Sequence, residues 1–174
     1  MIGLKYVGAA LVAAVALSAA PEARADMADL TSPASDPSLF ALGAGDIDFD
    51  HKEPAGELRG EYRFARGFYF IKPMIGAFGT SRHQVYAYGG FRLDFVFLDH
   101  FAVTPNAAVG WYNRGNGKAL GSPVEFKTGV ELAYRFDNAV RLGVAFDHIS
   151  NAGLTKLNPG TEQLLLVLSL PVPW

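Results

Sequence analysis

The chain has 174 residues, half of them hydrophobic, and its formal net charge is −2. This length fits one domain, and the near-neutral charge gives no reason to expect nucleic acid as a partner. The sequence has no cysteine, which excludes a disulfide framework, a lipoprotein anchor and a thiol-based active site.

The N-terminal stretch has the parts of an export signal. Lys5 precedes an apolar run from Val7 to Ala20, and Ala23-Arg24-Ala25 has the small-x-small form of a signal peptidase site. A retained membrane anchor is the alternative, but the run is short for a helix that spans a bilayer. We therefore expect residues 1–25 to be a cleaved signal peptide, and the polar, proline-containing residues 26–38 to be a flexible leader.

Residues 39–174 contain eight segments in which apolar and polar residues alternate with a period of two, as they do in β-strands. They cover roughly 39–49, 57–64, 68–79, 84–98, 101–111, 124–136, 140–150 and 162–170. The third is the least regular, because apolar residues occupy both faces around Lys72. Two prolines, Pro171 and Pro173, cannot donate to a sheet ladder, so we expect the last strand to end near Leu170.

Two folds accommodate this alternation. In a soluble β-sandwich the apolar faces form the core, whereas in an outer-membrane barrel they meet lipid and the charged faces line the lumen. Most of the segments exceed the usual five or six residues of soluble strands. Aromatic residues lie towards segment ends, and the chain ends on Trp174, as outer-membrane barrels commonly do. The predicted fold is therefore all-β: an eight-stranded antiparallel transmembrane β-barrel over residues 39–174.

The connections between segments also fit a barrel, because short ones alternate with longer ones, as periplasmic turns do with extracellular loops. The short connections are 65–67, 99–100 and 137–138, and the longer ones are 50–56, 80–83, 112–122 and 151–160. If the N-terminus is periplasmic, the seventh segment ends and the eighth begins at the extracellular rim.

Charged residues on the predicted inner faces should form an ion-pair network that fills the lumen. The basic members are Arg59, Arg63, Arg92, Arg135 and Arg141, and the acidic members are Glu57, Glu61, Asp94, Glu125 and Glu131. The run Asp46, Asp48 and Asp50 resembles a calcium-binding sequence. At strand period, however, these three carboxylates point one way, so we expect them to face the lumen as well. The remaining histidines show no metal-ligand spacing.

The motif that carries chemistry lies where the seventh segment ends and the eighth begins. His148 and Ser150 continue the apolar even-numbered face of the seventh segment, and Glu162 has the same parity in the eighth. In a barrel this face meets lipid, where polar and ionisable side chains are costly. A hydroxyl, an imidazole and a carboxylate on this face therefore indicate an active site. The alternative is that they are interface residues at the end of an inert barrel.

The run His148-Ile149-Ser150-Asn151-Ala152-Gly153-Leu154, followed by Asn158-Pro159-Gly160 and Glu162, resembles the active-site segment of the lipid A 3-O-deacylases of the PagL type. The resemblance covers about the last thirty residues. It implies a barrel in the bacterial outer membrane that hydrolyses the ester-linked 3-hydroxyacyl chain at the 3-position of lipid A. Lipopolysaccharide would then be the partner, and neither a metal nor an organic cofactor would be needed.

The resemblance also implies residue roles. Ser150 would be the nucleophile, His148 its general base and then acid, and Glu162 the group that orients the imidazole. Candidate oxyanion donors are Asn151, the backbone amide of Gly153, and Asn158. A phospholipase or acyltransferase with the same triad, and a non-catalytic barrel for lipid binding or adhesion, remain alternatives, because a triad sets the reaction class and the pocket sets the substrate.

Overall fold

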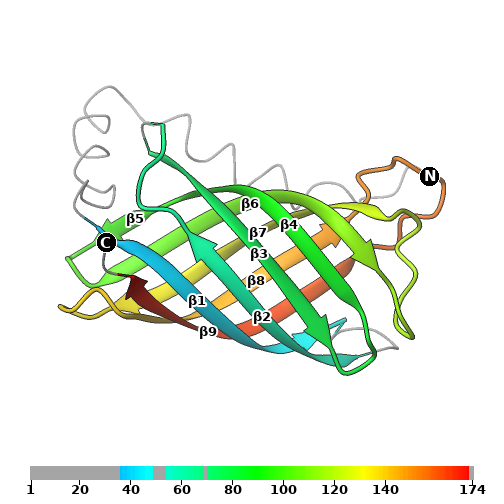
Figure 1. Ribbon diagram of the computed structural model, residues 1–174, viewed down its shortest axis with the longest axis horizontal. Helices are drawn as coiled ribbons and strands as arrows, with labels where there is room; N and C mark the ends of the chain where they lie inside the picture. The colour runs from blue at the N-terminus through cyan, green and yellow to red at the C-terminus, as the bar shows by residue number, and fades with distance from the viewer. Residues whose placement is uncertain (1–35, 49–53, 69, 173–174) are drawn as a thin grey trace, which may run out of the picture. The chain divides into compact units, whose positions relative to one another are not determined.

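The computed structural model describes residues 36–48, 54–68 and 70–172, and its strands form one closed antiparallel sheet (Figure 1). The predicted signal peptide, most of the predicted leader and Trp174 lie outside the described residues. The strands are β1 (Ser38–Ile47), β2 (Ala55–Arg63), β3 (Ile71–Thr80), β4 (Val85–Leu93), β5 (Phe95–Phe97), β6 (Phe101–Asn113), β7 (Val124–Arg135), β8 (Arg141–Ser150) and β9 (Thr161–Val172).

The barrel has eight positions although nine strands are distinguished. β4 and β5 share one position, since both pair with β6 and only Asp94 separates them. Neighbouring strands pair in chain order, and the pairing of β1 with β9 closes the sheet. The predicted eight-stranded antiparallel barrel is thus confirmed, and the fourth predicted segment covers both β4 and β5. Within the described residues, no helix is long and apolar enough to cross a bilayer.

Two predicted boundaries were wrong. β9 continues past Leu170 to Val172, with Pro171 opposite Leu39 of β1. Beyond Ser169, β9 no longer pairs with β8. Pro171 therefore has no β8 carbonyl to which a backbone N–H would donate. The connection after β2 is also longer than the predicted turn at 65–67, because β3 begins only at Ile71.

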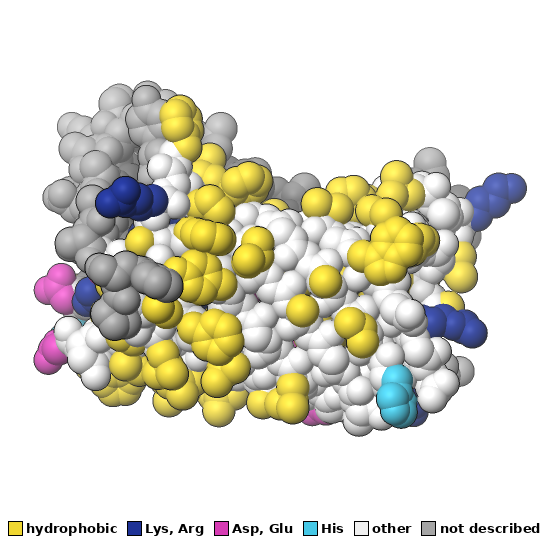
Figure 2. All heavy atoms as spheres, viewed as in Figure 1, with side chains coloured by type: hydrophobic (Ala, Val, Ile, Leu, Met, Phe, Trp, Pro, Cys, Tyr) yellow, Lys and Arg dark blue, Asp and Glu magenta, His cyan; other side chains and the backbone are white. Residues whose placement is uncertain are grey.

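The outer wall of the barrel is apolar. Figure 2 shows hydrophobic side chains spread over the face of the wall in view, and the charged side chains visible on this face lie mainly near its two ends. In β8 the even-numbered Leu142, Val144 and Phe146 are exposed, and the odd-numbered Arg141 and Asp147 are buried. This is the inverse of a soluble sandwich, in which apolar faces are covered, and it matches a wall that contacts lipid.

The lumen holds much of the predicted ion-pair network. Glu125 is an exception, because it is fully buried and its carboxylate makes no ion pair among the described residues. Arg59 Nη1 lies 2.6 Å from Asp147 Oδ2, and Arg63 Nη2 lies 2.6 Å from Glu131 Oε2. Arg141 Nη1 lies 3.2 Å from Asp94 Oδ1. The interior of the barrel is therefore filled by paired charges and by a cluster of buried apolar side chains that includes Met74, Phe78, Tyr86 and Ile149.

The predicted inward orientation was wrong for Asp46. Ile47 is fully buried and Asp46 is exposed, because Leu39 and Ala41 face inward and set the parity of β1. Asp48, just past the strand, has φ +59° and is buried, with its Oδ1 2.6 Å from Lys118 Nζ. Asp46 and Asp48 therefore do not share a face as calcium ligands would, and Asp50 lies outside the described residues.

Candidate active site

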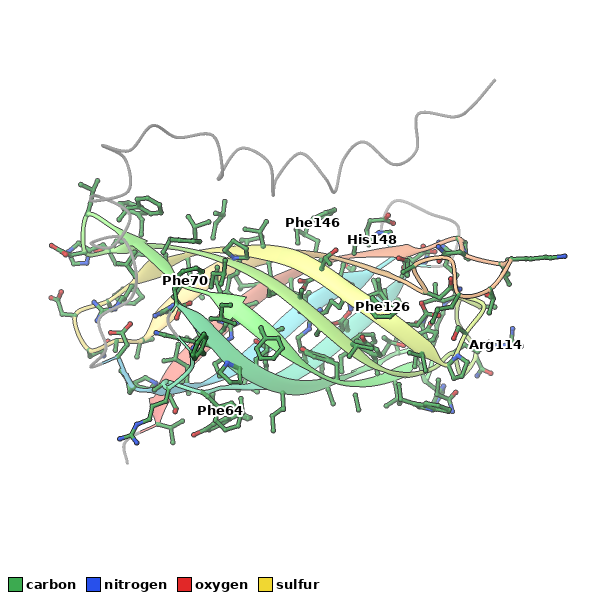
Figure 3. The ribbon with its side chains drawn as sticks, turned by 90° about the horizontal axis from the view of Figure 1, so that it is seen from above. Phe64, Phe70, Arg114, Phe126, Phe146 and His148 are labelled. Atoms are coloured by element: carbon green, nitrogen blue, oxygen red, sulfur yellow. The ribbon has the colours of Figure 1, made fainter. Side chains whose placement is uncertain are left out.

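The motif lies at the end of the barrel that carries the loops 81–84, 114–123 and 151–160, here called the loop end. Figure 3 shows Phe146 and His148 projecting from the outer wall, with Arg114 at the same end and Phe64 and Phe70 towards the other. Because β8 alternates inward and outward up to its last residue, His148 and Ser150 both belong to the outward face.

His148 and Glu162 come together across the β8–β9 ladder. They are directly opposite in register, and Nδ1 of His148 lies 3.2 Å from Oε1 of Glu162. The imidazole is 42% and the carboxylate 26% exposed, so the pair is open to a substrate at the surface. A neutral imidazole that donates its Nδ1–H to a carboxylate presents an unprotonated Nε2, which is the state a general base requires.

Ser150 is the last residue of β8 and is half-buried. It lies two residues beyond His148 on the same face and opposite Phe126 of β7. Among the described residues its hydroxyl makes no hydrogen bond, so the structure joins His148 to Glu162 and places Ser150 beside them without a bond. Such contacts are often long in a ligand-free enzyme and shorten when the substrate binds.

Asn151 ties together two loops behind Ser150. Its side chain is fully buried, and Nδ2 donates to Leu120 O at 2.8 Å, to Leu157 O at 2.8 Å and to Thr155 Oγ1 at 3.1 Å. Its Oδ1 accepts the backbone N–H of Gly153 at 3.0 Å. The donors of Asn151 and Gly153, two of the predicted oxyanion donors, are thus engaged in holding the loop 151–160 against the loop 114–123.

Asn158 differs from those two. Its Oδ1 accepts the backbone N–H of Asn151 at 3.0 Å, and that bond fixes which side of the amide is oxygen. Within the described part of the chain its Nδ2 makes no hydrogen bond, and the residue is partly exposed. Of the three predicted donors, Asn158 Nδ2 is the one left available to an incoming ligand.

The surroundings of the site are apolar. Phe146 and Leu164, two residues along each strand from His148 and Glu162, are 44% and 43% exposed on the same wall. A ligand that reaches the three polar groups therefore lies against a surface suited to hydrocarbon chains. No group of three His, Asp or Glu side chains in the described residues has the arrangement of a metal site.

Gly160 belongs to the motif, but the sequence alone indicates no role for it. In the structure it lies against the ring of His148: a Cβ built on it would be 2.6 Å from Cε1. The signal available in the sequence was a glycine directly before the strand that carries Glu162.

Comparisons with known proteins identify a family and a fold that this chain resembles. The profile of the family described as Lipid A 3-O-deacylase (PagL) matches residues 57–171, which include all three triad candidates. A crystal structure of the outer membrane enzyme PagL is similar with a TM-score of 0.59 and 18% identity, covering 77% of this chain and 99% of that one.

A de novo designed transmembrane β-barrel is similar with a TM-score of 0.57 and 10% identity, covering 82% of this chain and 99% of the design. At such identities the structural likeness establishes the barrel fold. None of the curated proteins compared with the chain matches its sequence. The family match and the barrel fold together support a location in the outer membrane.

Proposed function

The chain belongs to the lipid A 3-O-deacylase (PagL) family, and we propose that it removes the ester-linked 3-hydroxyacyl chain from the 3-position of lipid A with Ser150, His148 and Glu162. The observation that carries this proposal is the 3.2 Å contact between His148 Nδ1 and Glu162 Oε1 on the lipid-facing wall, beside Ser150. An inert barrel gains nothing from exposing an imidazole and a carboxylate there, because ionisable groups on a lipid-facing wall cost free energy.

The proposed reaction is acyl transfer through a covalent intermediate. Ser150 Oγ attacks the ester carbonyl while His148 Nε2 takes the hydroxyl proton, and Glu162 stabilises the imidazolium that forms. Collapse of the tetrahedral intermediate breaks the bond to the sugar oxygen, which leaves with the proton from His148. Water then attacks the acyl-serine with His148 again as base, and this step releases the 3-hydroxy fatty acid and restores Ser150.

The tetrahedral intermediate carries negative charge on the former carbonyl oxygen, and that charge needs hydrogen-bond donors. We assign this role to Nδ2 of Asn158, because its Oδ1 is already bonded to Asn151 N and this bond fixes the orientation of the amide. Asn151 and Gly153 then support the site by fixing the loop. These side-chain and backbone groups supply the base, the nucleophile and the oxyanion donor, so the proposed reaction requires no cofactor.

The substrate class follows from where the site lies. The loop end is proposed to face the outer leaflet, where lipid A presents its ester-linked chains at the level of the sugar. Phe146 and Leu164 extend the site along the wall, so acyl chains can remain in an apolar environment while the ester reaches Ser150.

The test is the mass of lipid A in cells that express the chain in their outer membrane. The wild type should convert lipid A to a form that lacks one 3-hydroxyacyl group, and Ser150→Ala should not. Ser122→Ala is a matched control, because Ser122 lies in the neighbouring loop 114–123 and, among the described residues, its hydroxyl is seen to accept one hydrogen bond, from the backbone N–H of Val124; it should retain the activity. Unchanged lipid A with a folded wild-type barrel would refute the proposal, and loss of chains from glycerophospholipids instead would assign the triad to a phospholipase.

A further inference from the structure

Gly160, the residue directly before β9, contacts the catalytic edge of the His148 ring. A Cβ built on Gly160 would lie 2.6 Å from Cε1 and 3.1 Å from Nε2 of His148. Contacts below 3.0 Å are essentially never made by real Cβ atoms, so the ring could not stay where it is beside any other residue. Nδ1 of the His148 ring lies 3.2 Å from Oε1 of Glu162. The imidazole is therefore held between a carboxylate and a bare stretch of backbone.

The backbone conformation of Gly160 does not by itself explain the glycine. Its φ is +65°, in the left-handed region that glycine adopts at no steric cost. Ala152, in the same loop, has φ +53°, so this loop already contains an alanine in that region. An alanine at residue 160 would carry the strain of this φ, as Ala152 does, and would in addition meet the imidazole of His148.

We infer that Gly160 is a positioning residue for the general base: because it lacks a side chain, the imidazole can lie against the backbone with Nδ1 on Glu162 and Nε2 directed to the reaction. This inference rests on the proposed function, in which Nε2 exchanges a proton with Ser150. A methyl group at residue 160 would push the ring away, and the ring could move only by lengthening its contact with Glu162 or by displacing Nε2.

The kinetic test is Gly160→Ala, assayed on purified barrels in detergent micelles with lipid A as the substrate. A general base contributes about 10²–10⁴-fold, and a displacement of about 1 Å can cost about 100-fold. We expect kcat per folded barrel to fall by about 100-fold, with KM within about threefold, because the apolar wall that holds the acyl chains is unchanged. A glycine that served only the turn would change the yield of folded barrel and leave kcat per folded barrel within about threefold; that result would overturn the inference.

The contact itself is tested by a double-mutant cycle on stability. Gly160→Ala should lower the denaturation midpoint of the wild type more than that of His148→Ala, in which the ring is absent. Gly153→Ala calibrates the cost of φ alone, since Gly153 has φ +83° and a Cβ there meets nothing within 4 Å. In the His148→Ala background the two alanine substitutions should cost about the same.

Each outcome of the cycle decides. An equal effect of Gly160→Ala in both backgrounds would overturn the contact. If Gly160→Ala does not fold, Gly160→Ala combined with His148→Ala should fold, and failure of both would likewise overturn it. The proposed function is judged separately by Ser150→Ala: an active Ser150→Ala refutes the triad, whereas an inactive Ser150→Ala beside a fully active Gly160→Ala refutes only the positioning role.

Discussion

Asp147 anchors β8 from inside the barrel, directly behind the residues of the proposed site. Its carboxylate is fully buried and lies 2.6 Å from Arg59 Nη1 and 3.2 Å from Lys127 Nζ, and it accepts from Asn106 Nδ2 at 3.2 Å. Asp147→Asn keeps the size of the side chain and removes the charge, so it leaves no cavity. It tests how much of the barrel's stability depends on this cluster.

The expected loss is about 3 kcal/mol. Removing one partner of a buried ion pair costs about 3–5 kcal/mol. The lower end applies here, because Arg59 keeps Glu57 at 2.9 Å and Lys127 keeps Asn106 Oδ1 at 2.7 Å. The free energy of unfolding should be measured by denaturant titration in detergent micelles, with tryptophan fluorescence as the signal.

Asp137→Asn is the matched control, since Asp137 is exposed in the turn between β7 and β8. It should change the free energy of unfolding by less than about 0.5 kcal/mol. Adding Lys127→Met to Asp147→Asn should recover part of the loss, because it removes the cation left without its charge partner. A loss in Asp147→Asn no larger than in Asp137→Asn would refute the view that the lumenal charges act as a mutually dependent cluster.

Three further substitutions test the site and the wall. Asn158→Ala should lower kcat by about 10²–10³-fold with little change in KM, as loss of an oxyanion donor does; an equal rise in KM alone would contradict that role. Asn151→Ala should lower the free energy of unfolding by about 1–3 kcal/mol, because the carbonyl of the buried Leu120 loses the donor Asn151 Nδ2; unchanged protease sensitivity of the loop 151–160 would count against it. Leu166→Arg, on the exposed wall, should cost about 2–4 kcal/mol in bilayers, and a negligible cost there would argue that this wall does not face lipid.

The barrel could be predicted because its determinants are local. A period of two along β7 and β8 sorts side chains into two faces, and the charges on one face of each strand required a polar lumen. The prediction failed at Asp46, where parity depends on the register of β1 with β9, and Asp48 is buried through a left-handed residue just beyond the strand. Charge at a strand end does not reveal which face it takes.

The site was less predictable, because its details depend on contacts between loops. The spacing of His148, Ser150 and Glu162 marks one outward face, and the register that pairs His148 with Glu162 follows once β8 and β9 are adjacent. Nothing local indicates that Asn151 would donate to Leu120 O, 31 residues earlier in the chain. The contact of Gly160 with the imidazole likewise depends on how the loop 151–160 closes, which periodicity does not describe.

The proposed reaction requires Ser150 to be an activated nucleophile on the outer wall of the barrel. An active-site-directed alkyl fluorophosphonate, added to the folded protein and followed by peptide mass spectrometry, tests it most directly, because the reagent modifies a serine hydroxyl that a neighbouring base activates. We expect one adduct on Ser150, present in the wild type and lost in His148→Ala. An adduct on a different residue would contradict the role of Ser150. Lipid A deacylation by a protein whose Ser150 is not modified by the reagent, and by Ser150→Ala, would contradict it as well.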